Sequence, residues 1–245
     1  MRRTFCLVMI LGSSALHAQT PAFEVASIKP SQTIGKPTMS AAKGGRINAT
    51  NVTLKYLILW AWDLRPYQIS DGPTWLDSAA FDIIATPEHP MDPSPDNIEI
   101  SRQMMRGLLA DRFQLAVRLE QKELPRYALI HAANGPALKA VEKWQNPTDM
   151  RVRGGSPGHL AGEKVTMTLL TQLLSDITGR QVVDKTSLTG YYDFKLDWTP
   201  DDAQPDPASP SIFTALQEQL GLKLQSEKGP VRVLTIERAE KPAAN

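Results

Sequence analysis

An internal repeat constrains the fold of this chain more than any other sequence feature. The run VTLKYLILWAWDL begins at Val52, and a similar run, VTMTLLTQLLSDI, begins 113 positions later at Val165. Repeats of this kind indicate that one supersecondary unit is used twice. The same offset also pairs Ile69 with Val182, Asp71 with Asp184 and Phe81 with Phe194.

A second block recurs at an offset of 107 positions. It pairs Leu109, Phe113, Leu115 and Val117 with Leu216, Leu220, Leu222 and Leu224, and Glu120, Leu129 and Ala132 with Glu227, Ile236 and Ala239. The first copy therefore carries six more residues than the second between the two blocks. These fall in PEHPMDPSPDN, a polar, proline-rich segment typical of a loop, where an insertion costs little free energy.

Each copy has the pattern of an α+β unit in the order strand, helix, strand, strand, helix, strand, strand. Thr53 and Thr166 are good N-caps before runs with apolar residues at helical spacing, and Gly179 is a good helix C-cap. The segments FDIIA, YYDFKLDW, PRYALIHAA and PVRVLTIERA alternate or run apolar as strands do. We expect the helices to pack on small mixed or antiparallel sheets.

The predicted domain organisation follows from these repeats and from the first eighteen residues. MRRTFCLVMILGSSALHA has two arginines, a short apolar run and small residues before Gln19, the layout of a secretory signal peptide. We predict a signal peptide at 1–18, a first α+β repeat at 19–133, a connection at 134–158, a second α+β repeat at 159–240 and a tail at 241–245. The protein is thus expected to be secreted or periplasmic.

Composition excludes several classes of function. Without the first eighteen residues, 25 basic and 26 acidic residues remain, so the chain has no general attraction for nucleic acid. The only cysteine is Cys6, so neither a disulfide nor thiol chemistry is expected after cleavage. No apolar segment beyond the signal peptide approaches the roughly 20 residues of a membrane span.

The chain resembles a large secreted family of unknown function from soil bacteria, chiefly Acidobacteria. The resemblance rests on FEVASIKP, GGRINATNVTLKYLI, SDGPTWLDSAAFDIIA, LLADRFQLAVRLEQKELPRYAL, DKTSLTGYYDFKLDWTP and ALQEQLGLKLQSEKGPVRVLTIERAEKPAAN, and covers nearly the whole mature chain. In that family's pattern, histidine is common at the position of Arg118, glycine at Ser187 and Asp-His at Glu237-Arg238. A shared histidine site is therefore not expected here.

The second copy is also distantly similar to the short N-terminal domains of secretins and TonB-dependent receptors. VTMTLLTQLLSDITGRQVVDKTSLTGYYDFKL followed by IFTALQEQLGLKLQ matches their order of helix, strand, strand and helix. This resemblance implies a role in protein contacts rather than catalysis, although fold likeness alone does not transfer function.

The residues nominate no catalytic or metal site and no cofactor. The mature chain has three histidines, His89, His131 and His159, and none is spaced as a metal-ligand pair. The segment around Ser156 has the wrong spacing for a nucleophile elbow, and Pro157 lacks the N–H that an oxyanion hole commonly uses. Carboxylate chemistry stays open, because the chain has 26 acidic residues and no pair stands out.

The one candidate binding surface is aromatic and lies in the first copy. Trp62, Arg65, Tyr67 and Trp75 belong to the residue types most enriched at binding hot spots, and the second copy has Ser175, Thr178, Arg180 and Leu188 at the same offset. Because Trp62 aligns with a serine, we expect it to be exposed or interdomain, whereas Trp60 aligns with Leu173 and is expected in the core. Tryptophans that fill a seam between the copies are the structural alternative.

The sequence therefore predicts a non-catalytic binding or protein-interaction module of the bacterial cell envelope. Its partner is expected to be a protein or peptide, bound at the aromatic region of the first copy or at a sheet edge. Two alternatives stay open. One is an envelope hydrolase that uses carboxylates, and the other is a small-molecule carrier with an apolar pocket between the repeats.

Overall fold

The computed structural model describes residues 21–92, 94, 97–141, 151–153, 158–200 and 210–242. By its contacts the chain forms two compact units. The first comprises Met1–Trp62, Trp75–Gln114 and Lys241–Asn245, and the second Asp63–Thr74 and Leu115–Glu240. The predicted signal peptide lies outside the described residues, as do parts of the predicted connection and tail. The predicted repeat boundaries derive from sequence offsets and stay a prediction.

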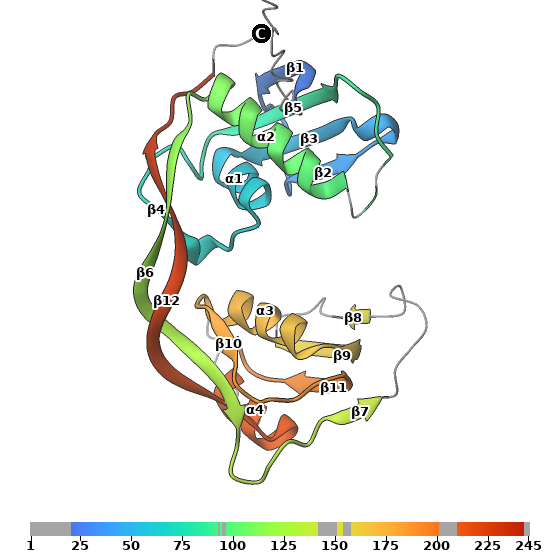
Figure 1. Ribbon diagram of the computed structural model, residues 1–245, viewed down its shortest axis with the longest axis vertical. Helices are drawn as coiled ribbons and strands as arrows, with labels where there is room; N and C mark the ends of the chain where they lie inside the picture. Colours follow the sequence, from blue (N-terminus) through green and yellow to red (C-terminus); the bar gives the residue numbers. More distant parts are fainter. Residues whose placement is uncertain are drawn as a thin grey trace, which may run out of the picture. The chain divides into compact units, whose positions relative to one another are not determined.

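The first unit is built on a four-stranded antiparallel sheet in the order β1-β5-β3-β2 (Figure 1). Alternation of burial along β5 shows that one face of the sheet is covered, since Phe81, Ile83 and Ala85 are buried while Ile84 between them is exposed. The strands are β1 (Phe23–Pro30), β2 (Thr38–Ala41), β3 (Ile47–Thr53) and β5 (Ala80–Pro87), with a short helix η1 (Lys43–Gly45) between β2 and β3.

Two helices of the first unit, α1 (Leu54–Trp62) and α2 (Ile98–Arg112), pack against each other and on this sheet (Figure 1). The predicted start of α1 is confirmed, because Thr53 Oγ1 accepts the N–H of Tyr56 (3.2 Å). The helix buries Leu54, Leu57 and Ile58 at helical spacing. Apolar periodicity and a threonine cap together determine where this element begins and which side faces the core.

The second unit contains a mixed sheet in the order β10-β6-β12-β4. Its centre is a long twisted ribbon of two antiparallel strands, β6 (Ala116–His131) and β12 (Leu222–Arg238) (Figure 1). Two short strands join the ribbon in parallel, β10 (Val182–Asp184) on β6 and β4 (Ile69–Ser70) on β12. The short helix η2 (Pro66–Gln68) precedes β4.

The same unit carries an antiparallel sheet in the order β7-β11-β9-β8 and two helices. The strands are β7 (Lys139–Val141), β8 (Arg151–Arg153), β9 (His159–Val165) and β11 (Tyr191–Asp197), and the helices are α3 (Met167–Thr178) and α4 (Ile212–Leu220). The predicted caps of α3 are confirmed, since Thr166 Oγ1 accepts the N–H of Leu169 and Gly179 is left-handed (φ 64°). Leu170, Leu174 and Leu216 lie in the core.

A bulge of the same geometry occurs in each unit, between β3 and β5 and between β9 and β11. The bulged residues Asn51 and Lys164 both have φ of 56°. The N–H of Asn51 donates to Asp82 Oδ1 (2.9 Å), and the N–H of Lys164 donates to Asp193 Oδ1 (2.8 Å). Bulges bend a strand and are placed rather than accidental features of a sheet.

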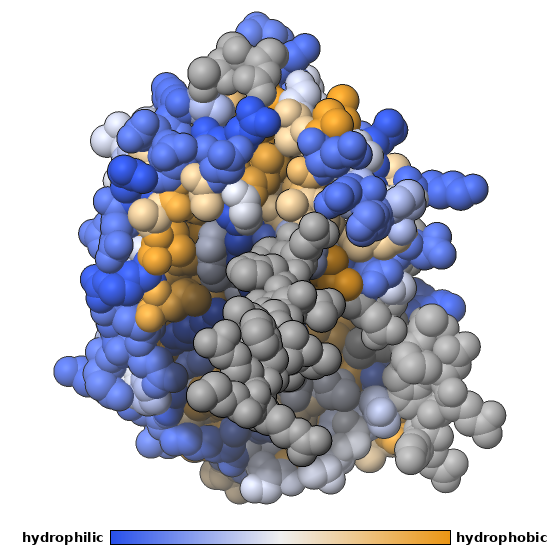
Figure 2. All heavy atoms as spheres, turned by 45° about the horizontal axis from the view of Figure 1, so that its top comes forward, coloured by the Kyte–Doolittle hydropathy of each residue, from blue (hydrophilic) through white to orange (hydrophobic). Residues whose placement is uncertain are grey.

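The α+β prediction is confirmed in the described residues, which form four α-helices and three four-stranded sheets, mixed or antiparallel. None of the described helices is long and apolar enough to cross a membrane. Figure 2 shows a face on which hydrophilic side chains predominate and hydrophobic side chains gather in small areas. Apolar areas of limited size are normal on a protein surface.

Candidate functional site

Trp62, the last residue of α1, is buried within the first unit. Its side chain is 9% exposed, and the guanidinium carbon of Arg106 lies 5.6 Å from the ring centroid. Arg106 Nε also donates to the Ala61 carbonyl oxygen (2.7 Å), which satisfies an acceptor at the open end of the helix. Of the two placements expected for Trp62, exposed or interdomain, exposure is therefore wrong, and the ring packs α1 against α2.

The reason for this error lies at Ser175, the residue that aligns with Trp62. Ser175 is itself only 4% exposed. Its hydroxyl donates to the Thr171 carbonyl oxygen (2.7 Å) and accepts the N–H of Val182 (2.8 Å). A serine whose hydrogen bonds are satisfied by the backbone is readily buried, so its polarity gave no information about exposure at the aligned position.

The other three predicted binding residues do not lie with Trp62. Trp75 is half-buried in the first unit, where its ring meets Phe81 edge-on with 6.5 Å between centroids and the Lys241 ammonium lies 5.8 Å from it. Arg65 and Tyr67 belong to the second unit. The predicted set is thus divided between the units, and its role in binding stays a prediction.

Arg65 and Tyr67 are engaged by the helix α3. Arg65 Nε lies 3.4 Å from Asp176 Oδ1, and burial raises the pKa of the Tyr67 hydroxyl, opposed by a hydrogen bond with Ser175. Burial also raises the pKa of the Asp176 carboxyl, opposed by the charge of Arg65. These contacts attach the segment Asp63–Thr74 to the second unit. They give Arg65 and Tyr67 a structural role.

Trp60, by contrast, borders a cavity of about 510 Å³ in the first unit. The ring was expected in the core, but it is only partly buried. Most of the cavity's lining is apolar, from Met39, Ala41, Ile47, Trp60, Met91 and Ile98. Volume and composition are those of ligand pockets, which are concave, mostly apolar and carry few polar groups.

Three polar side chains of the cavity wall, Ser94, Asn97 and Ser101, form hydrogen bonds within the wall itself. Asn97 Nδ2 donates to the Asp92 carbonyl oxygen (2.7 Å), the N–H of Asn97 donates to Ser94 Oγ (3.3 Å), and Ser101 Oγ donates to the Asn97 carbonyl oxygen (3.0 Å). These bonds join Asp92 and Ser94 to the first turn of α2. An occupant therefore meets a surface that is mainly apolar.

The cavity reaches the open side of the sheet. β2 is an edge strand, and three of its four residues, Met39, Ser40 and Ala41, border the cavity. Successive side chains of a strand point to opposite faces, so a cavity bordered by all three meets the strand along its edge. Ser40 and Ala41 are exposed, and the cavity is thus accessible from solvent.

None of the four residues predicted to bind a partner, Trp62, Arg65, Tyr67 and Trp75, borders this cavity. Gly45 (φ 78°) lies at the wall, where a Cβ would stand 3.0 Å from Met91 Cγ. The cavity brings together β2, α1 and the start of α2, which are far apart in the sequence. Only the tertiary structure assembles them, although Met39, Trp60 and Met91 are residue types typical of adaptable apolar sites.

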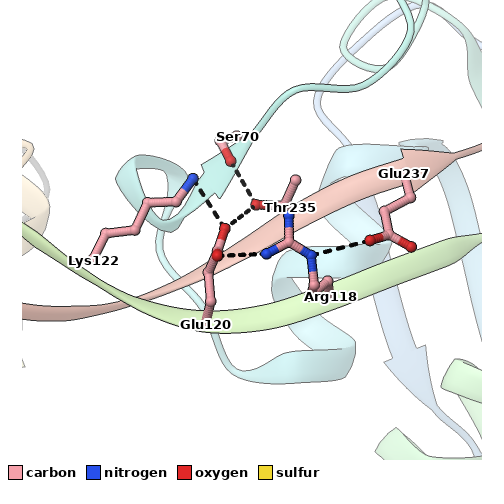
Figure 3. A network of polar contacts seen from close by, with 6 residues as sticks. All are labelled: Ser70, Arg118, Glu120, Lys122, Thr235 and Glu237. Carbon is pink, nitrogen blue, oxygen red and sulfur yellow. Dashed lines mark hydrogen bonds and ion pairs between the residues drawn. The ribbon is translucent and has the colours of Figure 1, made fainter.

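A separate polar network crosses β6, β12 and β4 in the second unit (Figure 3). Glu120 accepts from Arg118 (2.5 Å), from Lys122 (3.1 Å) and from Thr235 Oγ1 (2.9 Å). Arg118 Nε donates to Glu237 (3.1 Å). The hydrogen bond from Lys122 is the main cause that lowers the pKa of the Glu120 carboxyl, so this carboxylate is ionised at neutral pH and cannot act as a general acid there.

Glu227 forms a comparable ion cluster. It accepts from Lys185 Nζ (2.6 Å) and Arg126 Nε (2.9 Å), and the bond from Lys185 is the main cause that lowers its pKa. A carboxyl whose folded pKa is lowered stabilises the fold above its unfolded pKa, and this contribution is lost as pH falls through the folded pKa. We expect Lys185→Ala to raise the Glu227 pKa towards the ordinary value of about 4.3, measured by NMR titration of the side-chain carboxyl carbon.

Lys122→Ala is the matched control for this titration, because Lys122 pairs with Glu120 and not with Glu227. The Glu227 titration should be the same in this variant as in the parent protein. The pH dependence of stability gives a second measurement. Because Glu227→Gln removes a titrating group, the free energy of unfolding of this variant should fall less steeply below about pH 4.3 than that of the parent protein. An unchanged Glu227 titration in Lys185→Ala would show that this lysine does not hold the carboxylate in solution.

Within the described ranges, no three histidine, aspartate or glutamate side chains are grouped as metal ligands. His159 Nδ1 contacts Asp197 Oδ1 across β9 and β11, and both side chains are largely exposed. The segment around Ser156 lies outside the described residues. The arrangement that the structure does present for function is the apolar cavity beside an edge strand.

Comparison with known protein families identifies the family to which the chain belongs. A family model described as a protein of unknown function, DUF3738, matches residues 55–239. No curated protein and no solved structure matches the chain significantly. Since the family model covers more than half of the 245 residues, the chain belongs to the DUF3738 family. The expected membership of a family of unknown function is confirmed at this level.

Proposed function

We propose that this member of the DUF3738 family is a non-catalytic binding protein of the bacterial cell envelope, secreted or periplasmic, that recognises a protein or peptide partner. The observation that carries the proposal is the cavity of about 510 Å³ in the first unit, bordered by Trp60, Met91 and the edge strand β2. An apolar cavity beside the open edge of a strand suits a partner's apolar side chain.

The ionisable groups favour binding over hydrolysis. A carboxylate hydrolase needs an acid with a raised pKa in a cleft beside a second carboxylate. Among the described residues, the carboxyl with a raised pKa is Asp176, and its neighbour is the cation Arg65. Glu120 and Glu227 have lowered pKa values and are held by cations. None of these carboxyls borders the cavity.

A small-molecule carrier is the second candidate, and the cavity volume favours it. Pockets for drug-sized ligands measure roughly 300–1,000 Å³, and this one has about 510 Å³. The pocket for this candidate was expected between the repeats, but this cavity is lined by the first unit alone. The carrier would hold an apolar molecule, because most of the residues that line the cavity are apolar.

The proposal includes the two α+β repeats. Two pairs of features at the sequence offsets support them. The bulges at Asn51 and Lys164 are 113 positions apart and have the same φ. Two parallel strand pairs are also related by the offsets. β4 of the first copy pairs with β12 of the second, with Ile69 opposite Leu234. β10 of the second copy pairs with β6 of the first, with Val182 opposite Tyr127, and these residues lie 113 positions after Ile69 and 107 before Leu234.

This arrangement of the proposed repeats also revises one alignment. Asp82 and Asp193 play the same part at the two bulges and lie 111 positions apart, so Phe81 matches Tyr192 rather than Phe194. The likeness of the second copy to short N-terminal domains of secretins and TonB-dependent receptors belongs to the same proposal. This likeness favours a role in protein contacts, because those short domains act through contacts with other proteins.

Filling the cavity should abolish binding. Ser101→Phe places a ring in the cavity from α2, whereas Gln103→Phe places the same ring on an exposed position of that helix outside the cavity lining. Peptides selected from a random displayed library on the parent protein should bind Gln103→Phe equally and Ser101→Phe at least about tenfold more weakly, a loss of about 1.4 kcal/mol. Fluorescence anisotropy of the labelled peptides measures both.

The uncharged dye phenylnaphthylamine tests the carrier in parallel. Dye fluorescence that rises with the parent protein and with Gln103→Phe, but not with Ser101→Phe, would establish the cavity as an apolar binding site. If dye binds and no peptide is selected, the carrier is the better description. If both substitutions leave peptide binding and dye fluorescence unchanged, the proposed site is overturned.

A further inference from the structure

The backbone of β2 has hydrogen-bonding groups that face away from the sheet. β2 pairs with β3 so that Ser40 lies opposite Asn48 and Thr38 opposite Thr50, and the N–H of Ala42 donates to the Arg46 carbonyl oxygen (2.7 Å) in the same register. Hydrogen-bonded pairs alternate along antiparallel strands. Thr38 and Ser40 therefore bond to β3, and the N–H and C=O groups of Met39 and Ala41 point to the open edge.

These outward groups belong to the residues whose side chains border the cavity. Met39 and Ala41 pair with Ala49 and Ile47, which are buried on the helix side of the sheet, and both border the cavity. In the part of the chain that the structure describes, no strand pairs with this edge. An extended segment that binds along β2 would thus contact the backbone N–H and C=O groups of Met39 and Ala41 and also the apolar cavity.

Charges at the two ends of β2 limit the composition of such a segment. Lys36 precedes the strand, Lys43 and Arg46 follow it, and all three are exposed. Within the described residues, none of the three has an ion-pair partner. Among the described residues, the acid that borders the cavity is Asp92, which is exposed. Cations at both ends favour acidic residues in the partner, and Asp92 disfavours an acid in the cavity.

We propose that β2 binds an extended peptide segment by strand addition, with backbone hydrogen bonds to Met39 and Ala41, a bulky apolar side chain in the cavity and acidic residues towards the two ends of the strand. The proposal rests on the function proposed above and specifies the ligand of the same site. Backbone pairing provides part of the affinity in such complexes and the pocket provides the specificity.

Pentapeptides of the form Asp-Val-Xaa-Val-Asp, with both ends blocked, test the composition proposed for the bound segment. Binding to the protein is measured by calorimetric titration with phenylalanine, leucine, serine, aspartate or lysine at the centre. Phenylalanine and leucine should bind at least about tenfold more tightly than the other three, and binding should weaken as salt rises because the flanking charges are exposed. Equal affinity for all five centres would overturn the proposed role of the cavity in peptide selection.

Removal of single N–H groups tests the strand addition. Ala41→Pro deletes an N–H that faces the open edge and should weaken the phenylalanine peptide about tenfold or more while the protein stays folded, since proline is tolerated on edge strands. Ser40→Pro deletes an N–H bonded to β3, and its main effect should be on the thermal unfolding temperature. Methylation of the peptide's own amide nitrogens should also abolish binding, and this arm does not depend on the folding of any variant.

The outcomes separate this proposal from the one on which it rests. Pentapeptides that bind but are indifferent to both their own N-methylation and Ala41→Pro would overturn strand addition and leave the cavity as a binding site. The same holds if no pentapeptide binds while the dye still responds to Ser101→Phe. If neither dye nor peptide responds to Ser101→Phe, both proposals fail.

Discussion

Replacing Phe113 with alanine should destabilise the first unit by about 3–5 kcal/mol, the usual cost of deleting a fully buried phenylalanine. Phe113 follows α2 directly and is 0% exposed. Its ring meets Phe81 of β5 edge-on, with 5.1 Å between centroids and an interplanar angle of 88°. The substitution would leave a cavity where the end of a helix joins the covered face of the sheet.

Phe213→Ala is the matched control for this substitution. Phe213 lies on α4, is 36% exposed and meets Tyr127 edge-on at 5.5 Å, so its loss should cost about 1 kcal/mol. Urea unfolding followed by circular dichroism gives the overall change, and hydrogen exchange of amides in β3 and β5 isolates the first unit if the two units unfold separately. Equal losses at Phe113 and Phe213 would contradict the placement of Phe113 in the core.

Elements that depend on neighbouring residues could be predicted from the sequence. Thr53 and Thr166 cap their helices because a hydroxyl one turn from an orphan N–H can reach it whatever the tertiary context. Gly179 ends α3 in a left-handed conformation that other residues adopt at a cost. Strand alternation in FDIIA likewise survives as buried and exposed sides of β5. These signals are local, and the structure confirms them.

The continuous ribbon could not be predicted, because the sequence contains apparent strand breakers. Pro125 lies inside β6, and Gly229-Pro230 inside β12, where two shorter strands were expected in each repeat. β10 pairs only with Tyr127–Leu129, and β4 pairs only with Leu234–Thr235. Both prolines therefore lie where the ribbon has one unpaired side, so the missing N–H need not cost a hydrogen bond.

The errors at the tryptophans have a different cause. Alignment with the second copy indicated which positions are apolar, but burial depends on what covers each face of the helix. Arg106 of α2 covers Trp62, and Trp60 lies beside a cavity. The aligned residues of α3 could not reveal this, because α2 is 15 residues long and α4, its match in the sequence alignment, is nine. Sequence similarity between two segments thus predicts the course of the backbone better than the surroundings of a single side chain.

The cavity illustrates the limit of local reasoning for function. Its proposed ligand contacts come from a strand edge, a helix end and a loop that the sequence separates by up to about sixty positions. Hot-spot residue types nominated Trp62 and Trp75, whose rings pack inside the first unit. Residue type alone cannot distinguish an aromatic side chain that binds from one that fills a core, because both environments favour large apolar rings.

Gly221→Ala should have a destabilising effect of similar size, about 3–5 kcal/mol, through strain rather than a cavity. Gly221 is the left-handed C-cap of α4 (φ 62°). A Cβ there would stand 1.8 Å from the carbonyl oxygen of Gly135 and 3.0 Å from the nitrogen of Ala137. Real Cβ atoms do not approach backbone so closely, so the segment after β6 must move.

That movement would break two hydrogen bonds. The N–H of Ala132 donates to the Gly221 carbonyl oxygen (2.9 Å), and the N–H of Ala137 donates to the Leu220 carbonyl oxygen (2.8 Å). The bonds hold the chain that leaves β6 against the end of α4. Their loss exposes or orphans four backbone groups, which adds to the strain of a left-handed alanine.

Gly179→Ala separates the two contributions. Gly179 has nearly the same conformation (φ 64°) at the end of α3, but a Cβ there meets no atom within 4 Å. It should therefore cost only the left-handed strain, about 1–2 kcal/mol. Urea midpoints of the two variants measure the difference, which is the contribution of the close approach between Gly221 and Gly135. If the two alanines cost the same, the packing of the segment after β6 on α4 does not stabilise the second unit in solution.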